Sequence, residues 1–237
     1  AADSGESYNV ALGAEAMNLV NIATADNNIA IGRAALNGGT STGKQNIAIG
    51  SLVMNQSTNA ADQCVIIGAN AGQGAMTADA DGTVAIGYQA GTALTSGQYN
   101  TAIGYQALLV EATGDKSTAI GYSALKAQTG VDGNANNTAV GYKAALGLTT
   151  STNNVAVGTG ALASEDTGGG HVAIGSGSSY FTDCDGGNTV IGNDACYYNI
   201  SGKANVIVGF QAALGASSNS HSYNTAVGYQ TMDGVTT

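Results

Sequence analysis

Short apolar triplets recur along the chain at a regular interval, separated by longer polar stretches. In a typical copy, Thr101-Ala102-Ile103, a small residue stands between two larger ones and Gly104 follows directly. Alternation of this kind over a few residues is typical of a β-strand, in which positions i and i+2 share a face. The intervening stretches are rich in Gly, Ser, Thr, Asn and Asp, which favour turns. The pattern therefore predicts a series of short strands joined by loops.

The glycine that follows each triplet fixes the period of the repeat. Thirteen copies lie between residues 9 and 232, and their glycines are 17 to 20 residues apart. A period of this length is typical of solenoids, whereas segments this short cannot form long helices. We expect residues 1–237 to form a single all-β domain, a parallel β-solenoid (β-roll or β-helix) of about thirteen coils. The anchor glycines are Gly13, Gly32, Gly50, Gly68, Gly87, Gly104, Gly121, Gly141, Gly158, Gly175, Gly192, Gly209 and Gly228.

The two faces of each predicted strand differ in size. The positions three and one before the glycine hold only Val, Ile, Leu or Thr, and the position between them is Ala in ten copies. We expect the larger residues to be buried and the row of alanines to pack closely against another chain, which makes the rod a homo-oligomer, most simply a trimer. The alternative is that alanine lines the cramped interior of a narrow coil.

Asparagine occupies the position four before the glycine in nine copies. Stacked asparagines can hydrogen-bond along a column, so we interpret this slot as a structural ladder, with a polar ligand-binding row as the alternative. Cys64, Thr83, Ser117 and His171 occupy the same slot in the other copies. The ladder comprises Asn9, Asn28, Asn46, Asn100, Asn137, Asn154, Asn188, Asn205 and Asn224.

Aromatic residues directly follow the anchor glycine in six copies. Because three of these copies are consecutive and a fourth follows, the rings are expected to stack in a column. Such a column packs at a corner or a subunit contact, or it grips a carbohydrate or a protein receptor. The column comprises Tyr88, Tyr105, Tyr122, Tyr142, Phe210 and Tyr229.

The charge of the chain bears on its partners. The net charge is −10 with only six Lys and Arg, which argues against nucleic acid and anionic lipid as partners. No apolar run approaches the length of a membrane span, so no membrane insertion is expected.

The chain lacks the common catalytic motifs, and we expect neither enzymatic activity nor a cofactor. Three carboxylate pairs lie in Gly-rich stretches: Asp79 with Asp81, Glu165 with Asp166, and Asp183 with Asp185. Carboxylate pairs serve glycosidases, but solvated turn acids are the favoured interpretation here.

Calcium and disulfides are left open by the sequence. Asp79, Asp81, Asp183 and Asp185 carry hard oxygen ligands suited to Ca²⁺, but neither pair extends into a known calcium loop, and we expect no metal. Cys184 and Cys196 are close enough in sequence to pair, whereas Cys64 is too many coils away to reach either.

Three blocks carry a resemblance to known proteins: NTAIGYQAL (Asn100 to Leu108), NTAVGYKAA (Asn137 to Ala145) and NTAVGYQTM (Asn224 to Met232). They resemble repeats of phage tail-fibre proteins and are similar to repeats in the head domains of trimeric autotransporter adhesins. The resemblance implies a trimeric β-roll with an adhesive surface. The adhesin repeats are shorter, and neither a stalk nor an anchor is apparent here.

These observations predict a non-enzymatic structural fibre or adhesin-like rod at an extracellular or virion surface, contacting a glycan or protein receptor. The alternative is an extracellular filament whose subunits join end to end through uncapped coils. A third interpretation is ice binding by Thr101, Thr118, Thr138, Thr189 and Thr225, which share one slot. The strand face that carries them is expected to be buried, which counts against it.

Overall fold

The computed structural model describes residues 8–18, 25–38, 42–56, 59–129, 133–164, 168–181, 186–198, 202–215 and 222–232. Its main element is a thirteen-stranded parallel sheet with the strands in chain order. These strands are β1 (Val10–Leu12), β2 (Ile29–Ile31), β3 (Ile47–Ile49), β4 (Val65–Ile67), β5 (Val84–Ile86), β6 (Thr101–Ile103), β8 (Thr118–Ile120), β10 (Thr138–Val140), β11 (Val155–Val157), β12 (Val172–Ile174), β13 (Thr189–Ile191), β14 (Val206–Val208) and β15 (Thr225–Val227).

Two smaller elements lie in the loops. The strands β7 (Gly114–Asp115) and β9 (Gly133–Asn134) form a second, two-stranded parallel sheet. The 3₁₀ helix η1 (Ala78–Ala80) begins after Thr77, whose hydroxyl accepts a hydrogen bond from the Asp79 amide. No helix in the described residues is long and apolar enough to cross a membrane.

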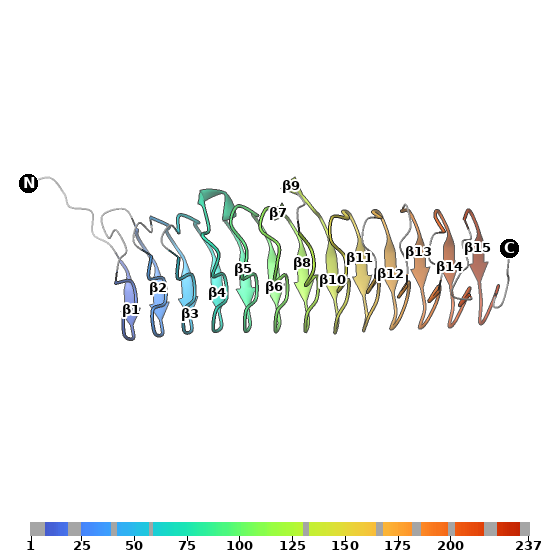
Figure 1. Ribbon diagram of the computed structural model, residues 1–237, viewed down its shortest axis with the longest axis horizontal. Helices are drawn as coiled ribbons and strands as arrows, with labels where there is room; N and C mark the ends of the chain where they lie inside the picture. Colours follow the sequence, from blue (N-terminus) through green and yellow to red (C-terminus); the bar gives the residue numbers. More distant parts are fainter. Residues whose placement is uncertain are drawn as a thin grey trace, which may run out of the picture.

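Each strand pairs with its equivalents in the adjacent coils without any shift of register. Thr101 is opposite Thr118, and Thr118 is opposite Thr138, so equivalent residues form columns along the rod. Figure 1 shows the strands side by side in a straight row, with β1 and β15 at opposite ends. Twelve inter-strand spacings of about 4.8 Å give a length of roughly 58 Å. The predicted all-β parallel solenoid is confirmed.

The anchor glycines allow this close stacking. Gly104 has a φ of +139°, and a Cβ added there would lie 2.3 Å from the carbonyl oxygen of Gly121 in the next coil. A larger residue would thus meet both a backbone conformation that L side chains rarely adopt and a direct overlap. Glycine recurs at this position because the same backbone contact with the next coil is made in coil after coil.

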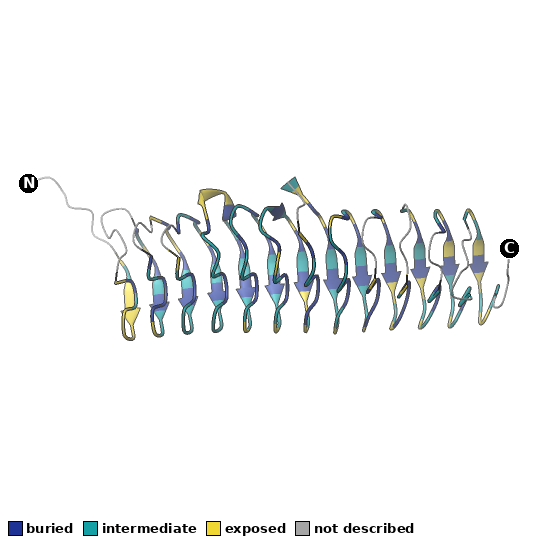
Figure 2. Ribbon diagram, viewed as in Figure 1, coloured by how far each residue is buried: buried dark blue, intermediate teal, exposed yellow. Residues whose placement is uncertain are grey.

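In the large sheet the central residue of every strand after β1 points into the coil, and in nine of these twelve strands it is alanine, which corrects the predicted orientation of the faces. Ala102 and its equivalents from Ala30 onwards are almost fully buried, whereas Ala11 in β1 is exposed. The flanking residues are less buried than the central alanine, and Thr101 and Ile103 are only partly buried. Figure 2 shows this as a dark band across the middle of the strands with paler flanks. The interior is too narrow for two rows of branched side chains, so the methyl column fills it. Of the two interpretations of the alanine row, packing against another chain and lining the narrow interior of the coil, the second is correct.

The opposite wall of the coil supplies the rest of the core. Ala107 and Leu108, after the anchor glycine, are fully buried, and so is Leu94 at the seventh position after the glycine of its coil. The apolar core divides into two clusters, one ending at Ala173 and the other beginning at Val190. Near this division, Ser178 and Ser179 occupy positions that are mostly apolar in other coils, and both are buried.

Candidate functional site

The asparagine ladder lies along one inner corner of the coil. Asn100 accepts a hydrogen bond at Oδ1 from the amide of Ser117, at 2.9 Å, and its Nδ2 donates to the carbonyl oxygen of Gly114, at 2.7 Å. Asn28 and Asn46 make the same pair of bonds in the first coils. Each amide therefore pairs backbone groups of the neighbouring coil where the strand begins. Because these side chains are buried and bonded to backbone, they are poorly placed to bind a ligand.

Histidine and cysteine are also accommodated in the asparagine slot, at His171 and Cys64. His171 donates its amide to Asn154 Oδ1 at 2.9 Å, and its ring Nδ1 accepts from the Asn188 amide at 3.3 Å, so the imidazole replaces the asparagine oxygen. Cys64 has a buried free thiol, and its backbone amide donates to Asn46 Oδ1. Burial raises the pKa of the Cys64 thiol to about 11, and nearby Asp81 adds to the rise.

Of the four carboxylates considered for calcium, the structure describes Asp79 and Asp81. Asp79 is exposed in η1, and Asp81 Oδ1 accepts the Asp62 amide of the preceding coil at 2.6 Å, which makes Asp81 a backbone cap. No group of three or more His, Cys, Asp or Glu side chains suited to a metal occurs among the described residues. Asp183 and Asp185 lie outside the described residues, as do Glu165, Asp166 and Cys184. Cys196, the proposed partner of Cys184, is buried.

The aromatic column is a continuous stack over four coils. The rings of Tyr88, Tyr105, Tyr122 and Tyr142 follow one another with centroids 5.1–5.2 Å apart and interplanar angles of 5–19°. Phe210 and Tyr229 form a separate pair at 5.7 Å. Because stacked rings cover each other's faces, a sugar can stack only on a ring at the end of a column. The phenol edges remain exposed along its length.

A cavity of about 300 Å³ lies where the column stops. After Tyr142, the next three coils carry Thr159, Ser176 and Asn193 in the slot that follows the anchor glycine. The cavity is lined by Tyr142, Lys143, Thr159, Gly160, Ser176, Tyr180 and Asp194, among others. It combines aromatic rings with both signs of charge.

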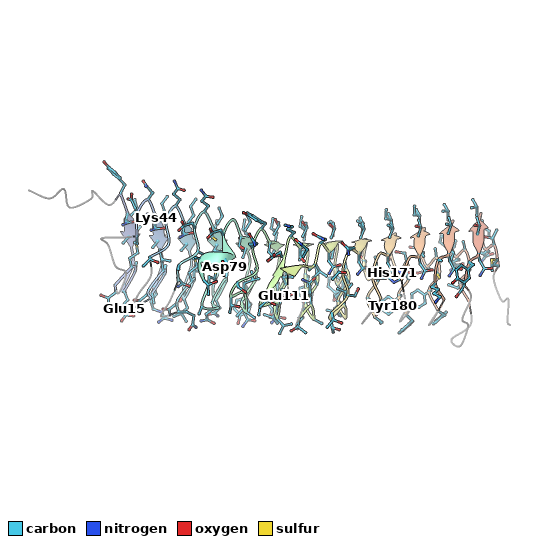
Figure 3. All side chains as sticks on the ribbon, turned by 90° about the horizontal axis from the view of Figure 1, so that it is seen from above. Glu15, Lys44, Asp79, Glu111, His171 and Tyr180 are labelled. Carbon is cyan, nitrogen blue, oxygen red and sulfur yellow. The ribbon has the colours of Figure 1, made fainter. Side chains whose placement is uncertain are left out.

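A second group of aromatic residues forms the far wall of this cavity. Tyr180 and Tyr197 stack with centroids 5.0 Å apart, and Phe181 packs edge-on against both. Figure 3 shows Tyr180 on the same long side of the rod as Glu15, whereas Lys44 lies on the other side. Burial raises the pKa of Tyr197, and the neighbouring Tyr180, Tyr198 and Asp194 add to this shift. The predicted contact column did not include this group, because its residues lie four positions further along the coil.

A buried carboxylate was also missed by the sequence analysis. Glu111 is fully buried, and its Oε1 accepts the amides of Ala112, Thr113 and Gly114 at 2.8–3.0 Å. Its Oε2 accepts from Gln128 Nε2 at 2.9 Å. The carboxylate is saturated by donors inside the protein, so it acts as a structural anchor. Alignment of the repeats could have found it, since the equivalent position holds Leu94, Gln128 and Leu148.

The residues that flank the strand alanines form an outer strip along the rod. Many of them are exposed, including Val10, Ile120, Ile174, Ile191 and Val227. The expectation that this face is buried within the chain is wrong, so burial does not count against ice binding by its five threonines. Val or Ile fills the same slot in the other copies, which still counts against it. We define the outer strip as Val10, Leu12, Ile29, Ile31, Ile47, Ile49, Val65, Ile67, Val84, Ile86, Thr101, Ile103, Thr118, Ile120, Thr138, Val140, Val155, Val157, Val172, Ile174, Thr189, Ile191, Val206, Val208, Thr225 and Val227.

Comparison of the chain with protein-family models, curated proteins and solved structures gave no match. The resemblance to tail-fibre and adhesin repeats therefore stays a prediction that depends on the repeat blocks themselves.

Proposed function

We propose that this protein is a non-enzymatic fibre or adhesin-like rod of a phage tail or a cell surface, that it works as a homotrimer, and that it contacts a receptor through its sides. A stack of coils joined by continuous hydrogen bonding is stiff along its axis, which suits a part that spans distance. The observation that carries the proposal is the outer strip, an apolar surface that runs the whole length of the rod.

The size of the outer strip supports self-association. A strand of three residues is about 10 Å long, so thirteen strands over roughly 58 Å present about 600 Å². Contiguous apolar patches of more than a few hundred Å² typically mark interaction sites. In a parallel trimer the strips of three chains meet around the axis, and equivalent coils lie at the same height. The choice of three chains over two follows from the resemblance to trimeric adhesin heads.

Sedimentation or mass photometry of the purified chain tests the assembly, and a trimeric mass is expected. Ile120→Lys places a charge at the centre of the strip, where the wild-type side chain is 36% exposed, and should release monomers that keep their β-sheet signal in circular dichroism. Val110→Lys introduces the same charge at a residue 46% exposed outside the strip and should leave the trimer intact. A monomeric wild-type protein would contradict the proposal.

One observation favours the alternative of an end-to-end filament. Among the described residues, β1 and β15 each pair with one neighbouring strand only, and Val10 in β1 and Val227 in β15 are more than half exposed. Such edges are templates for pairing with another chain. Electron microscopy separates the two proposals, because a fibre segment gives rods of uniform length and a filament subunit gives polymers of indefinite length.

A further inference from the structure

The tyrosine column leaves one ring face of Tyr142 without an aromatic partner. Its other face stacks on Tyr122, but the next coil carries Thr159, which is exposed and too small to cover the ring. The Lys143 ammonium lies over the Tyr142 ring, 5.2 Å from its centre. Because the stacked rings follow the direction of the coils, this ring face is turned along the rod axis and into the cavity.

Two glycines open the floor of the cavity and let the second aromatic stack lean over it. A Cβ at Gly160 would lie 3.0 Å from Cε2 of Tyr180, and one at Gly177 would lie 2.5 Å from Oδ1 of Asp194. In the coils of the tyrosine column, the same position holds Gln89, Gln106, Ser123 or Lys143 instead. Side chains of that size would fill the space that the cavity occupies.

The result is a slot between two aromatic walls. Tyr142 and Tyr180 lie two coils apart, which corresponds to about 10 Å along the axis. Tyr180 also lies four positions further along its coil than Tyr142, so the two rings are offset sideways as well as along the axis. The cavity volume of about 300 Å³ is at the lower end of the range for small-ligand sites.

The polar groups around the slot suit a ligand that carries many hydroxyl groups. Lys143 at one end donates, Asp194 at the other end accepts, and the hydroxyls of Thr159 and Ser176 between them do both. The opposite charges of Lys143 and Asp194 balance, which favours an uncharged ligand. A ring with one apolar face of C–H groups and a rim of hydroxyls matches both the aromatic walls and the polar ends.

We propose that this slot binds one uncharged pyranose unit of a surface glycan, the C–H face of the sugar lying against Tyr142. The proposal rests on the proposed function as a receptor-binding rod and names the chemical class of the receptor. The bound sugar lies between Tyr142 and Tyr180, and its hydroxyls bond to Lys143, Asp194 and Ser176.

Saturation-transfer difference NMR tests the site, with the methyl glycosides of glucose, galactose, mannose and N-acetylglucosamine, and with methyl glucuronide as a charged comparison. We expect saturation transfer to the C–H protons of at least one neutral glycoside. Absence of transfer to all of them, or transfer to the glucuronide alone, overturns the proposal.

Two matched variants locate the binding. Thr159→Tyr restores the residue typical of the repeat, extends the column and covers the Tyr142 face, so it should weaken binding at least about tenfold. Ala69→Tyr makes the equivalent extension at the other end of the column, beside Tyr88, and should leave binding unchanged. Asp194→Asn keeps the size of the side chain and should weaken binding as well. Equal binding by Thr159→Tyr and wild type, or equal losses in both tyrosine variants, overturns the proposal.

The outcome is separable from that of the proposed assembly. A trimeric rod without sugar binding overturns this inference alone, whereas a monomer that binds sugar in the slot overturns the trimer alone.

Discussion

Replacing an anchor glycine with alanine should destabilise the rod strongly and for a reason that one control can isolate. In Gly104→Ala the new methyl would lie 2.3 Å from the Gly121 oxygen, whereas ordinary contacts begin at 3.4 Å. The two coils must therefore separate by about 1 Å at this point. The substituted residue must also hold a φ of +139°.

The magnitude follows from these two terms. A non-glycine residue in this backbone region costs about 1–3 kcal/mol. Separation of the coils loosens the hydrogen bonds from the Gly121 amide to Ile103 and from the Ser123 amide to Tyr105, now 2.7 and 2.8 Å long. At about 0.5–1.5 kcal/mol each, they bring the loss in free energy of unfolding to about 2–6 kcal/mol.

Gly228→Ala is the matched control. Its φ of +126° is similar, but the added Cβ would meet only Cγ2 of Thr231, at 3.2 Å. It should show the backbone cost of about 1–3 kcal/mol and little more. Urea unfolding followed by circular dichroism measures both variants, at one protein concentration because assembly shifts apparent stability. Equal losses in the two variants would refute the argument that the glycine is required by stacking.

Three further predictions concern single buried groups. Asn100→Ala leaves the Ser117 amide and the Gly114 carbonyl unpaired and should lower the free energy of unfolding by about 2–4 kcal/mol, whereas Gln106→Ala on the surface should change it little. Glu111→Gln puts an amide where four donors converge and should cost about 1–3 kcal/mol in urea unfolding; Glu15→Gln, at an exposed position, serves as its control, and equal effects would contradict the buried role. Burial raises the pKa of Cys64 from 9.0 to about 11, which means that the folded protein favours the protonated thiol. The stabilisation from this preference is fully present below about pH 9 and is lost as the pH rises through about 11. Peptide mass spectrometry after iodoacetamide treatment at pH 8 should find Cys64 unmodified in the native protein and modified in urea.

The fold could be predicted because one residue type marks every coil. A glycine that must contact the backbone of the next coil cannot vary, so the spacing from Gly13 to Gly228 reports the period directly. The short triplets before it then define thirteen strands that pair in parallel. Variation in the loops does not obscure this signal, since loops project from the stack.

The orientation of the strands could not be predicted from the triplets alone. Alternation shows that Ala102 lies on the opposite face from Thr101 and Ile103, but it does not say which face is inside. Larger apolar residues usually occupy the interior, and that general rule gave the wrong answer here. The width of the coil decides, and it depends on where the chain turns after the glycine.

The candidate sugar site was missed for a different reason. Gly160 and Gly177 lie in stretches that turn, and a glycine in a turn needs no further explanation. The signal was the loss of tyrosine at Thr159 together with the gain of Tyr180 in the next coil. Only the structure shows that these changes face one another across a cavity.

Strands this alike have a consequence for how the chain reaches its native state. In a nascent polypeptide, Thr101–Ile103 could pair with β10 almost as well as with β8, since the triplets differ by one methylene group at the third residue. A mispaired intermediate of this kind skips one turn and extrudes it as a loop. The Glu111–Gln128 hydrogen bond joins the two coils whose order such a skip would disturb, and it can form only when they are adjacent. Contacts of this type, which differ from coil to coil, therefore favour the native order of coils over a pairing that skips one.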